Sequence, residues 1–246
     1  RNVDGGSHNY RSVHLAAQGC YVAHIDGDDL ILPGKLQAQA DLLDARADIA
    51  YCAHAVRVID SDHLMGTDPA YPEVGDIRDL LRLGTYFVHS SVMYRRESGG
   101  VERFPGHVID YYMHIERAAH GNIFLDKRVL GAYRYHAAGL SGSPARAAAI
   151  ERHYEQAFDR ALALGVEPEF VQRCRLDRRM KHAVARCLAG DAKGYAEVVT
   201  LKGQDWRLAG WKHRALSLTR HAPGVVHLYF GAKRLLARRP HLVRSA

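Results

Sequence analysis

The stretch AHIDGDDLILPGKL (residues 23–36) decides how this chain is interpreted, because it sets an acidic cluster directly after an apolar run. Asp26, Asp28 and Asp29 fall within four positions. The overlapping segment CYVAHI (20–25) is typical of a short buried strand. Because ligands bind where loops follow the carboxyl ends of strands in open α/β sheets, this order predicts a ligand site at a strand end.

Apolar runs and helical spacing alternate on both sides of this stretch, which predicts an α/β domain with a largely parallel sheet. Strands are expected at residues 20–25, 49–60, 87–96 and 129–136, and helices at 9–19, 34–48, 77–84 and 108–121. In the second of these helices one stripe is expected to be buried, formed by Leu36, Ala40, Leu43 and Ala47.

Charge is distributed unevenly along the 246 residues. Residues 1–143 hold 14 Lys and Arg against 18 Asp and Glu, whereas residues 144–246 hold 20 against 9. The change falls at GLSGSPARAAA (139–149), a stretch that indicates a boundary. Since 47% hydrophobic and 25% charged residues are typical of globular proteins, we expect a domain over 1–143 and a basic, mostly α-helical region over 144–246.

Several classes of protein are not expected from the composition. The four scattered cysteines form no C-x-x-C pair, which favours free thiols in a reducing, cytoplasmic compartment. The 16 histidines show neither H-x-x-x-H nor H-E-x-x-H spacing, so zinc is not expected. No apolar run reaches the ~18–20 residues of a membrane-spanning helix. The start has neither Met nor a signal-peptide layout, so we expect the chain to begin inside a longer gene product.

The acidic cluster has two interpretations. Carboxylates this close raise one another's pKa unless a cation neutralises them. Mg²⁺ and Mn²⁺ prefer oxygen ligands and commonly bind one or two carboxylates together with substrate phosphates, which predicts a metal–diphosphate site. The alternative is a solvated turn in which Asp29 caps the following helix.

A wider pattern surrounds the cluster. It consists of Asn9, Ala17, Gly19, Tyr21 and Val22, then D-x-D-D at Asp26, Asp28 and Asp29, then Pro33 and K-L-x-x-Q at Lys35, Leu36 and Gln39. With HSSVMYRRE (89–97), DYYMHIERAAHG (110–121) and YRYHAAGLS (133–141), it resembles the nucleotide-sugar glycosyltransferases of family 2 over about residues 5–143. The resemblance implies the GT-A fold, a Rossmann-like mixed sheet flanked by helices. It also implies metal-dependent, inverting transfer of a sugar from a nucleoside diphosphate, expected to be UDP, to a hydroxyl acceptor.

The resemblance also assigns roles at the nucleotide side. It implies that Asp26 holds the ribose side and that Asp28 ligates Mn²⁺ or Mg²⁺ at the diphosphate. Asn9 is expected to contact the nucleotide sugar. Ser90 and Ser91 are expected near the acceptor, or else they only satisfy local backbone groups.

Further along the chain, the resemblance implies that Asp110 is the catalytic base, although Ile109 replaces the acidic residue that precedes it in the family. The alternative for Asp110 is a charge that favours a helix N-terminus. Arg134 is expected to pair with phosphate oxygens. His136 is expected to approach the metal, or else to be an ordinary polar residue.

The family's opening strand, loop and helix should precede residue 1, so the domain is expected to be N-terminally incomplete, with an exposed sheet edge and poor solubility. A catalytically silent GT-A-like binding or scaffold subunit is therefore the alternative function. A nucleotidyl or phosphoryl transfer enzyme is a weaker one, because DGGSHN (4–9) lacks the Lys-Ser/Thr of a phosphate loop.

The last stretch, residues 211–244, mixes aromatic and apolar residues with Lys and Arg. It is expected either to be a solvated basic face or to contact an anionic membrane at its inner surface, where glycan or lipid-linked acceptors would be met. No nucleic-acid-binding motif accompanies the charge, so nucleic acid is not expected.

Overall fold

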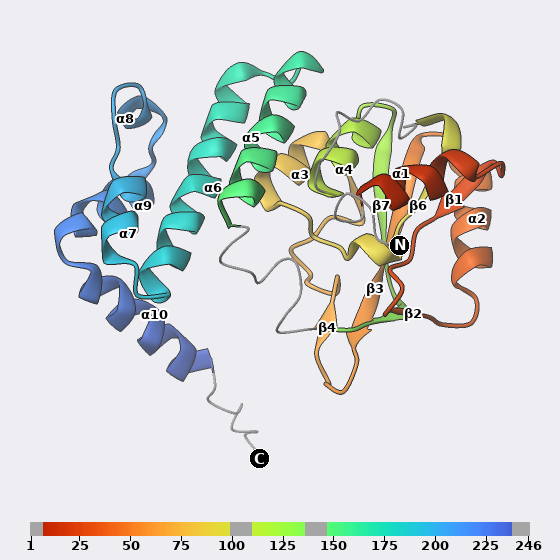
Figure 1. The fold of residues 1–246 in the computed structure, drawn as a ribbon, viewed down its shortest axis with the longest axis horizontal. Helices are drawn as coiled ribbons and strands as arrows, with labels where there is room; N and C mark the ends of the chain where they lie inside the picture. Colours follow the sequence, from red (N-terminus) through yellow and green to blue (C-terminus); the bar gives the residue numbers. More distant parts are fainter. Residues whose placement is uncertain (1–6, 99–109, 136–146, 238–246) are drawn as a thin grey trace, which may run out of the picture. The chain divides into compact units, whose positions relative to one another are not determined.

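The computed structural model describes residues 7–98, 110–135 and 147–237 (Figure 1). The chain divides into two compact units, residues 1–166 and 167–246. The predicted boundary at 143/144 lies outside the described residues, and the structural division falls further along the chain.

A seven-stranded mixed sheet is the centre of the first unit. Its strands are β1 (Tyr21–Ala23), β2 (Leu30–Ile31), β3 (Ile49–Val58), β4 (Leu64–Met65), β5 (Val74–Gly75), β6 (Met93–Arg95) and β7 (Asn122–Tyr133). The order is β1-β6-β3-β7-β2, with β4 paired to β3 and β5 to β7.

The sheet is mixed, as the resemblance implies, but the expectation of a largely parallel sheet is wrong. The long strands β3 and β7 pair in parallel, from Ile49 opposite Asn122 to Val58 opposite Tyr133. The other five pairings are antiparallel. An alternation of apolar and amphipathic runs reveals the elements but not the strand direction, which depends on where each connection returns.

Helices cover both faces of this sheet. They are α1 (Ser7–Ala16), α2 (Lys35–Ala45), α3 (Ile77–Leu83) and α4 (Asp110–Ala118). On β3, Cys52 packs in a cluster with Leu43 of α2, while its neighbour Tyr51 stacks on His114 of α4. Because successive strand residues point to opposite faces, α2 and α4 lie on opposite sides of the sheet.

The buried stripe of α2 differs from the expected one. Lys35, Gln39 and Leu43 are buried, whereas Leu36 is 50% exposed. The helix is rotated so that two polar side chains point inward, where backbone carbonyls accept their hydrogen bonds.

The strand expected at 87–96 is mostly wrong. His89–Ser91 form a 3₁₀ turn, η2, and only Met93–Arg95 pair as β6. By contrast, β7 begins at Asn122, earlier than expected. The helix at Ile77–Leu83 is as expected: Asp76 caps it reciprocally with Asp79.

Helix α5 (Ala147–Ala163) belongs with the first unit. The carboxylate of Glu116 on α4 is buried and accepts two hydrogen bonds from Arg160, at 2.5 Å from Nε and 2.9 Å from Nη2. Tyr111 packs against Tyr154 and Phe158 of α5. This pairing of α4 with α5 places the unit boundary after α5.

The second unit is helical, as expected. It contains α6 (Pro168–Leu188), α7 (Ala192–Val199), α8 (Asp205–Leu208), α9 (Trp211–Leu218) and α10 (Pro223–Ala237). Its core is built on one stripe of α6, formed by Leu176, Met180, Ala183 and Cys187, and on Tyr195 and Val199 of α7. In the described parts of both units, no helix has the length and apolarity that a membrane crossing requires.

Candidate functional site

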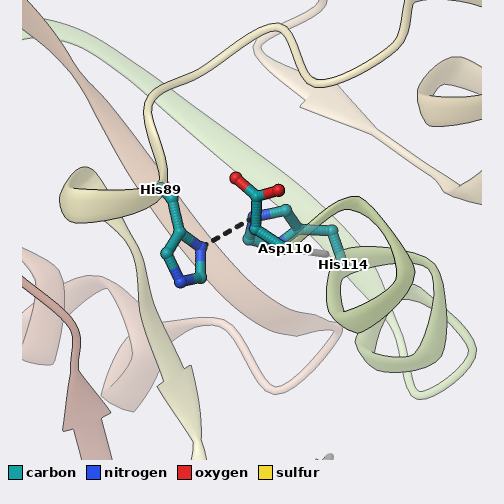
Figure 2. A group of neighbouring side chains, drawn as sticks. All are labelled: His89, Asp110 and His114. Carbon is teal, nitrogen blue, oxygen red and sulfur yellow. Dashed lines mark hydrogen bonds between the residues drawn. The ribbon is translucent and has the colours of Figure 1, made fainter. Parts of the chain in front are cut away.

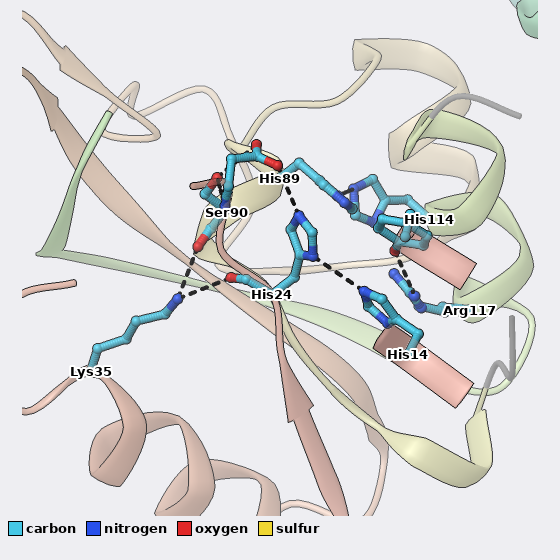
Figure 3. A network of polar contacts seen from close by, with 9 residues as sticks. His14, His24, Lys35, His89, Ser90, His114 and Arg117 are labelled. Carbon is cyan, nitrogen blue, oxygen red and sulfur yellow. Dashed lines mark hydrogen bonds and ion pairs between the residues drawn. The ribbon is translucent and has the colours of Figure 1, made fainter. Parts of the chain in front are cut away.

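The acidic loop, residues 26–29, follows β1 and is held by hydrogen bonds to the side chains around it (Figure 3). One carboxylate oxygen of Asp26 lies 3.1 Å from His24 Nε2, and the other accepts from Ser90 Oγ at 2.9 Å. The hydrogen bond with His24 is the main cause that lowers the pKa of Asp26. The hydroxyl of Ser91 instead donates to a carbonyl of its own turn, as the backbone-satisfying alternative expected.

The loop is also tied to the end of β7. Asp29 Oδ1 accepts the backbone N–H of Arg134 at 2.8 Å, and Arg134 Nε donates to the carbonyl of Asp28 at 3.2 Å. The interpretation of Asp29 as a helix cap is therefore wrong, because α2 begins after Gly34. The Asp29 carboxylate instead accepts the backbone N–H of the residue that follows β7. Arg134 does lie beside the acidic loop, while its phosphate role stays a prediction.

Lys35 and Gln39 are buried and donate hydrogen bonds to backbone carbonyls next to this loop. Lys35 is 1% exposed, and its Nζ donates to the carbonyls of Ser90 at 2.9 Å and His24 at 3.4 Å (Figure 3). Gln39 donates to the carbonyl of Ser91 at 2.8 Å. Burial lowers the pKa of Lys35 to about 8. These bonds give the K-L-x-x-Q pattern a physical reason, since its two polar residues fix the main chain on both sides of the site.

Four histidines from separate segments gather next to the acidic loop (Figure 3). His14 Nε2 lies 3.2 Å from His24 Nδ1, and His89 Nδ1 lies 3.2 Å from His114 Nε2. The rings of His24 and His89 are 4.2 Å apart, and Tyr10 stacks on His14 at 4.1 Å. The sequence spacing alone did not suggest that these histidines meet.

Burial keeps most of this cluster uncharged. It lowers the pKa of His14 to about 4 and the pKa of His89 and His114 well below the usual range. The positive charge of Arg117 lowers all three further. Arg117 is itself buried, with its guanidinium 3.7 Å from the centre of the Tyr94 ring. At neutral pH His14, His89 and His114 are therefore uncharged.

Asp110 opens α4, and the backbone N–H of Tyr111 donates to its Oδ1 at 3.0 Å. Burial is the main cause that raises the pKa of Asp110, and the charge of Asp26 raises it further. His89, Asp110 and His114 each offer one metal-ligand atom, and these atoms lie within 4.8 Å of one another (Figure 2). The carboxylate predicted as the base thus lies beside two histidines of the cluster, near enough to Asp26 for its charge to act on it.

The remaining predicted residues are less informative. Asn9 lies on α1 with an exposed side chain, one residue before Tyr10 of the histidine cluster. His136 and Ile109 lie outside the described residues. The roles of Asn9 and His136 stay predictions.

Sequence reasoning missed the histidine cluster, Arg117 and the buried position of Lys35. One signal was available: Asp110 and His114 stand four apart at the start of a helix, a spacing that puts two side chains on one face. No comparable signal connects His14, which lies on α1, to the others, because that contact depends on the tertiary fold.

Comparisons with known proteins give partial matches. No family model matches the chain. Proteins of Mycobacterium bovis and Mycobacterium tuberculosis, both named as uncharacterized, are 34% identical over 148 residues, which is 57% of this chain and 42% of theirs. The chain therefore spans less than half the length of these curated relatives. The crystal structure of S. aureus TarS, a glycosyltransferase, matches 89% of this chain and 40% of its own, with a TM-score of 0.56 at 10% identity.

The chain has a glycosyltransferase-like fold. The mixed sheet flanked by helices is the architecture that the family resemblance implies, and the helical region after it is the one expected from the sequence pattern. Within this glycosyltransferase-like fold, the acidic loop follows the edge strand β1, and α4 begins on the face where the histidines gather.

Proposed function

We propose that the chain belongs to a nucleotide-sugar glycosyltransferase, which moves a sugar from a nucleoside diphosphate to a hydroxyl acceptor with inversion. The observation that carries this proposal is the proximity of two carboxylates from distant segments. Asp26, at the end of β1, lies close enough to Asp110, at the start of α4, to raise its pKa. In this proposal Asp26 belongs to the donor site and Asp110 is the base, within a glycosyltransferase-like fold.

The residues of the acidic loop suit a hard divalent cation. Asp28 has an exposed side chain, and the buried Oδ2 of Asp29 has no hydrogen-bond partner among the described residues. Oxygen donors of this kind fit Mn²⁺ or Mg²⁺. Asp28 would hold the ion and Asp26 the ribose side, with Arg134 toward the phosphates. The bound ion would offset the charge that develops on the departing nucleoside diphosphate.

Asp110 is the proposed base. Its carboxylate takes the proton of the acceptor hydroxyl as that oxygen forms a bond to the anomeric carbon. The bond from that carbon to the diphosphate breaks on the opposite face, and its electron pair leaves with the nucleoside diphosphate. Burial raises the pKa of Asp110, which brings it closer to the operating pH and improves a general base.

The donor half of the proposal is tested by calorimetric titration of UDP into the full chain with and without Mn²⁺. Asp28→Asn should abolish the Mn²⁺-dependent part, and Asp62→Asn, an exposed carboxylate outside the site, should leave it intact. A folded wild-type chain that binds no UDP with Mn²⁺ would favour the catalytically silent alternative.

The base is tested by sugar transfer to a hydroxyl acceptor. Asp110→Asn should lower kcat by roughly 10²–10⁴-fold, the usual contribution of general base catalysis, while Mn²⁺–UDP binding persists. Equal loss of nucleotide binding would instead mean that Asp110 supports the donor site rather than the proton transfer.

We also propose that the second unit contacts an anionic membrane surface, where a glycan or lipid-linked acceptor would be found. Large side chains are exposed on α9 and α10, including Trp211 at 76%, Leu228 at 76% and Tyr229 at 62%. Residues 167–246 also hold 17 Lys and Arg against 6 Asp and Glu. Apolar anchors with a basic surround favour binding to anionic lipid. Co-sedimentation with phosphatidylserine vesicles should fall in Leu228→Glu and be absent with neutral vesicles.

A further inference from the structure

The side chains of His89, Asp110 and His114 form a group that the proposed transfer does not explain. His89 comes from the 3₁₀ turn η2, and Asp110 and His114 come from successive turns of α4 (Figure 2). Only Asp110 has a role in the proposed reaction. The two imidazoles converge on that carboxylate from different elements, with one ligand atom from each residue inside 4.8 Å.

The spacing of the ring nitrogens suits a shared cation. His89 Nδ1 and His114 Nε2 are 3.2 Å apart. Two nitrogens bound to one tetrahedral zinc ion at ~2.0–2.1 Å lie about 3.3 Å from each other. The hydrogen bond that joins these rings can therefore be replaced by a metal ion with little movement of either side chain.

The second imidazole of the group is buried and not fully paired. His114 is fully buried, and its Nδ1 has no hydrogen-bond partner within the part of the chain that the structure describes. That group is therefore incompletely satisfied as it stands.

Arg117 opposes a cation at this place, because its positive charge acts on both rings. Its guanidinium, however, lies over the face of Tyr94. Asp110 supplies one negative charge directly, and Asp26 lies near enough to act on Asp110. Two carboxylates thus offset the single positive charge.

We infer that His89, Asp110 and His114 bind a divalent cation of the zinc class, at a site separate from the Mn²⁺ or Mg²⁺ position proposed at Asp28. Two imidazoles with one carboxylate suit Zn²⁺ or Co²⁺ better than Mg²⁺. Three protein ligands leave a fourth position for water. A consequence rests on the proposed function: a cation bound to Asp110 occupies the base, so Zn²⁺ inhibits sugar transfer.

Metal binding is tested directly on the full chain without nucleotide. Zn²⁺ is titrated calorimetrically, and Co²⁺ serves as a probe whose visible absorption reports its coordination. The variants are His89→Gln and Asp110→Asn, with His63→Gln, an exposed histidine, as the control. His89 is chosen over His114 because His114 is fully buried against Tyr51 and its replacement endangers folding.

Each of the two ligand variants should weaken Zn²⁺ binding at least about tenfold, since even outer-shell partners are worth about 10–100-fold. Both should also lose the Co²⁺ absorption bands, while His63→Gln keeps them. A wild-type chain that binds neither ion overturns the inference. So does Zn²⁺ binding that His89→Gln and Asp110→Asn, folded by circular dichroism, leave unchanged.

The inhibitory consequence has its own measurement. In a transfer assay with excess Mn²⁺, Zn²⁺ should inhibit the wild-type chain, and His89→Gln should raise the inhibition constant at least about tenfold. Binding without inhibition would refute the blocking of the base. If no transfer occurs at all, the proposed function fails, and the Zn²⁺ titration still decides the metal site.

Discussion

The pair of Glu116 and Arg160 fastens α5 to the first unit, and its removal gives a sharp prediction. The Glu116 side chain is 2% exposed, and both of its oxygens accept from Arg160. Arg160→Met keeps most of the side-chain volume but leaves a buried carboxylate without its cation. Breaking a buried pair in this way costs about 3–5 kcal/mol. That loss is a large part of the roughly 5–15 kcal/mol that stabilises a typical domain.

The assay is urea unfolding with two signals. Both tryptophans, Trp206 and Trp211, lie in the second unit, so their fluorescence follows that unit alone. Circular dichroism follows both units. With a slope of about 2 kcal/mol per molar urea, the midpoint of the first unit should fall by about 1.5–2.5 M in Arg160→Met. The tryptophan transition should not move.

The matched control is Arg46→Met in the first unit, in the exposed pair with Asp48, where the two side chains are 42% and 47% exposed. Such an exposed pair contributes little to stability, because water screens it. The double variant Glu116→Gln with Arg160→Met should cost less than Arg160→Met alone, because it removes the stranded charge. An Arg160→Met shift no larger than that of Arg46→Met would refute the reasoning.

Three other predictions concern buried groups of the first unit. Burial lowers the pKa of His54 from 6.5 to about 4, so the unfolded chain binds its proton first and stability falls as pH drops from 6.5 to 4, by about 3 kcal/mol. Because His14, His89 and His114 act in the same direction, His54→Asn should reduce this pH dependence of thermal unfolding without abolishing it, and His63→Asn should leave it unchanged. Gly121 has φ +153°, and a Cβ there would lie 2.8 Å from a backbone oxygen. Gly121→Ala should therefore lower the free energy of unfolding, measured by urea denaturation, by about 1–3 kcal/mol. Gly224→Ala should cause no such loss, because its Cβ would meet open space. Lys35→Met should weaken Mn²⁺–UDP binding at least about tenfold in titration. The reason is that it removes charged hydrogen bonds to the main chain of the site, each worth about 1.5–3 kcal/mol. Unchanged affinity would show that the loop holds its shape without these bonds.

The sequence predicts most elements of the first unit because their signals are local. The apolar run from Ile49 to Val56 predicts a strand, and the structure has one there. Gly84 and Gly121 lie after the helices that they were expected to end. The alternation cannot report strand direction. The turn at His89–Ser91 was also missed, because its apolar neighbours resemble a continuing strand.

The candidate site is predictable only in part. The acidic loop and Asp110 stand out by residue type, and the structure gathers them. The face of α2 was predicted wrongly because Lys35 is polar, and a polar residue is expected outside unless its partners are known. Those partners are backbone carbonyls at His24 and Ser90, which only the folded chain brings together.

The bond between Asp29 and Arg134 joins positions 105 residues apart. Closing so long a loop costs entropy that only the assembled sheet repays, so the acidic loop is expected to take its final shape late in folding. A chain can thus have most of its helices and strands while its site is still unformed. The proposed Mn²⁺-dependent nucleotide binding would therefore be a stricter criterion of complete folding than helix content.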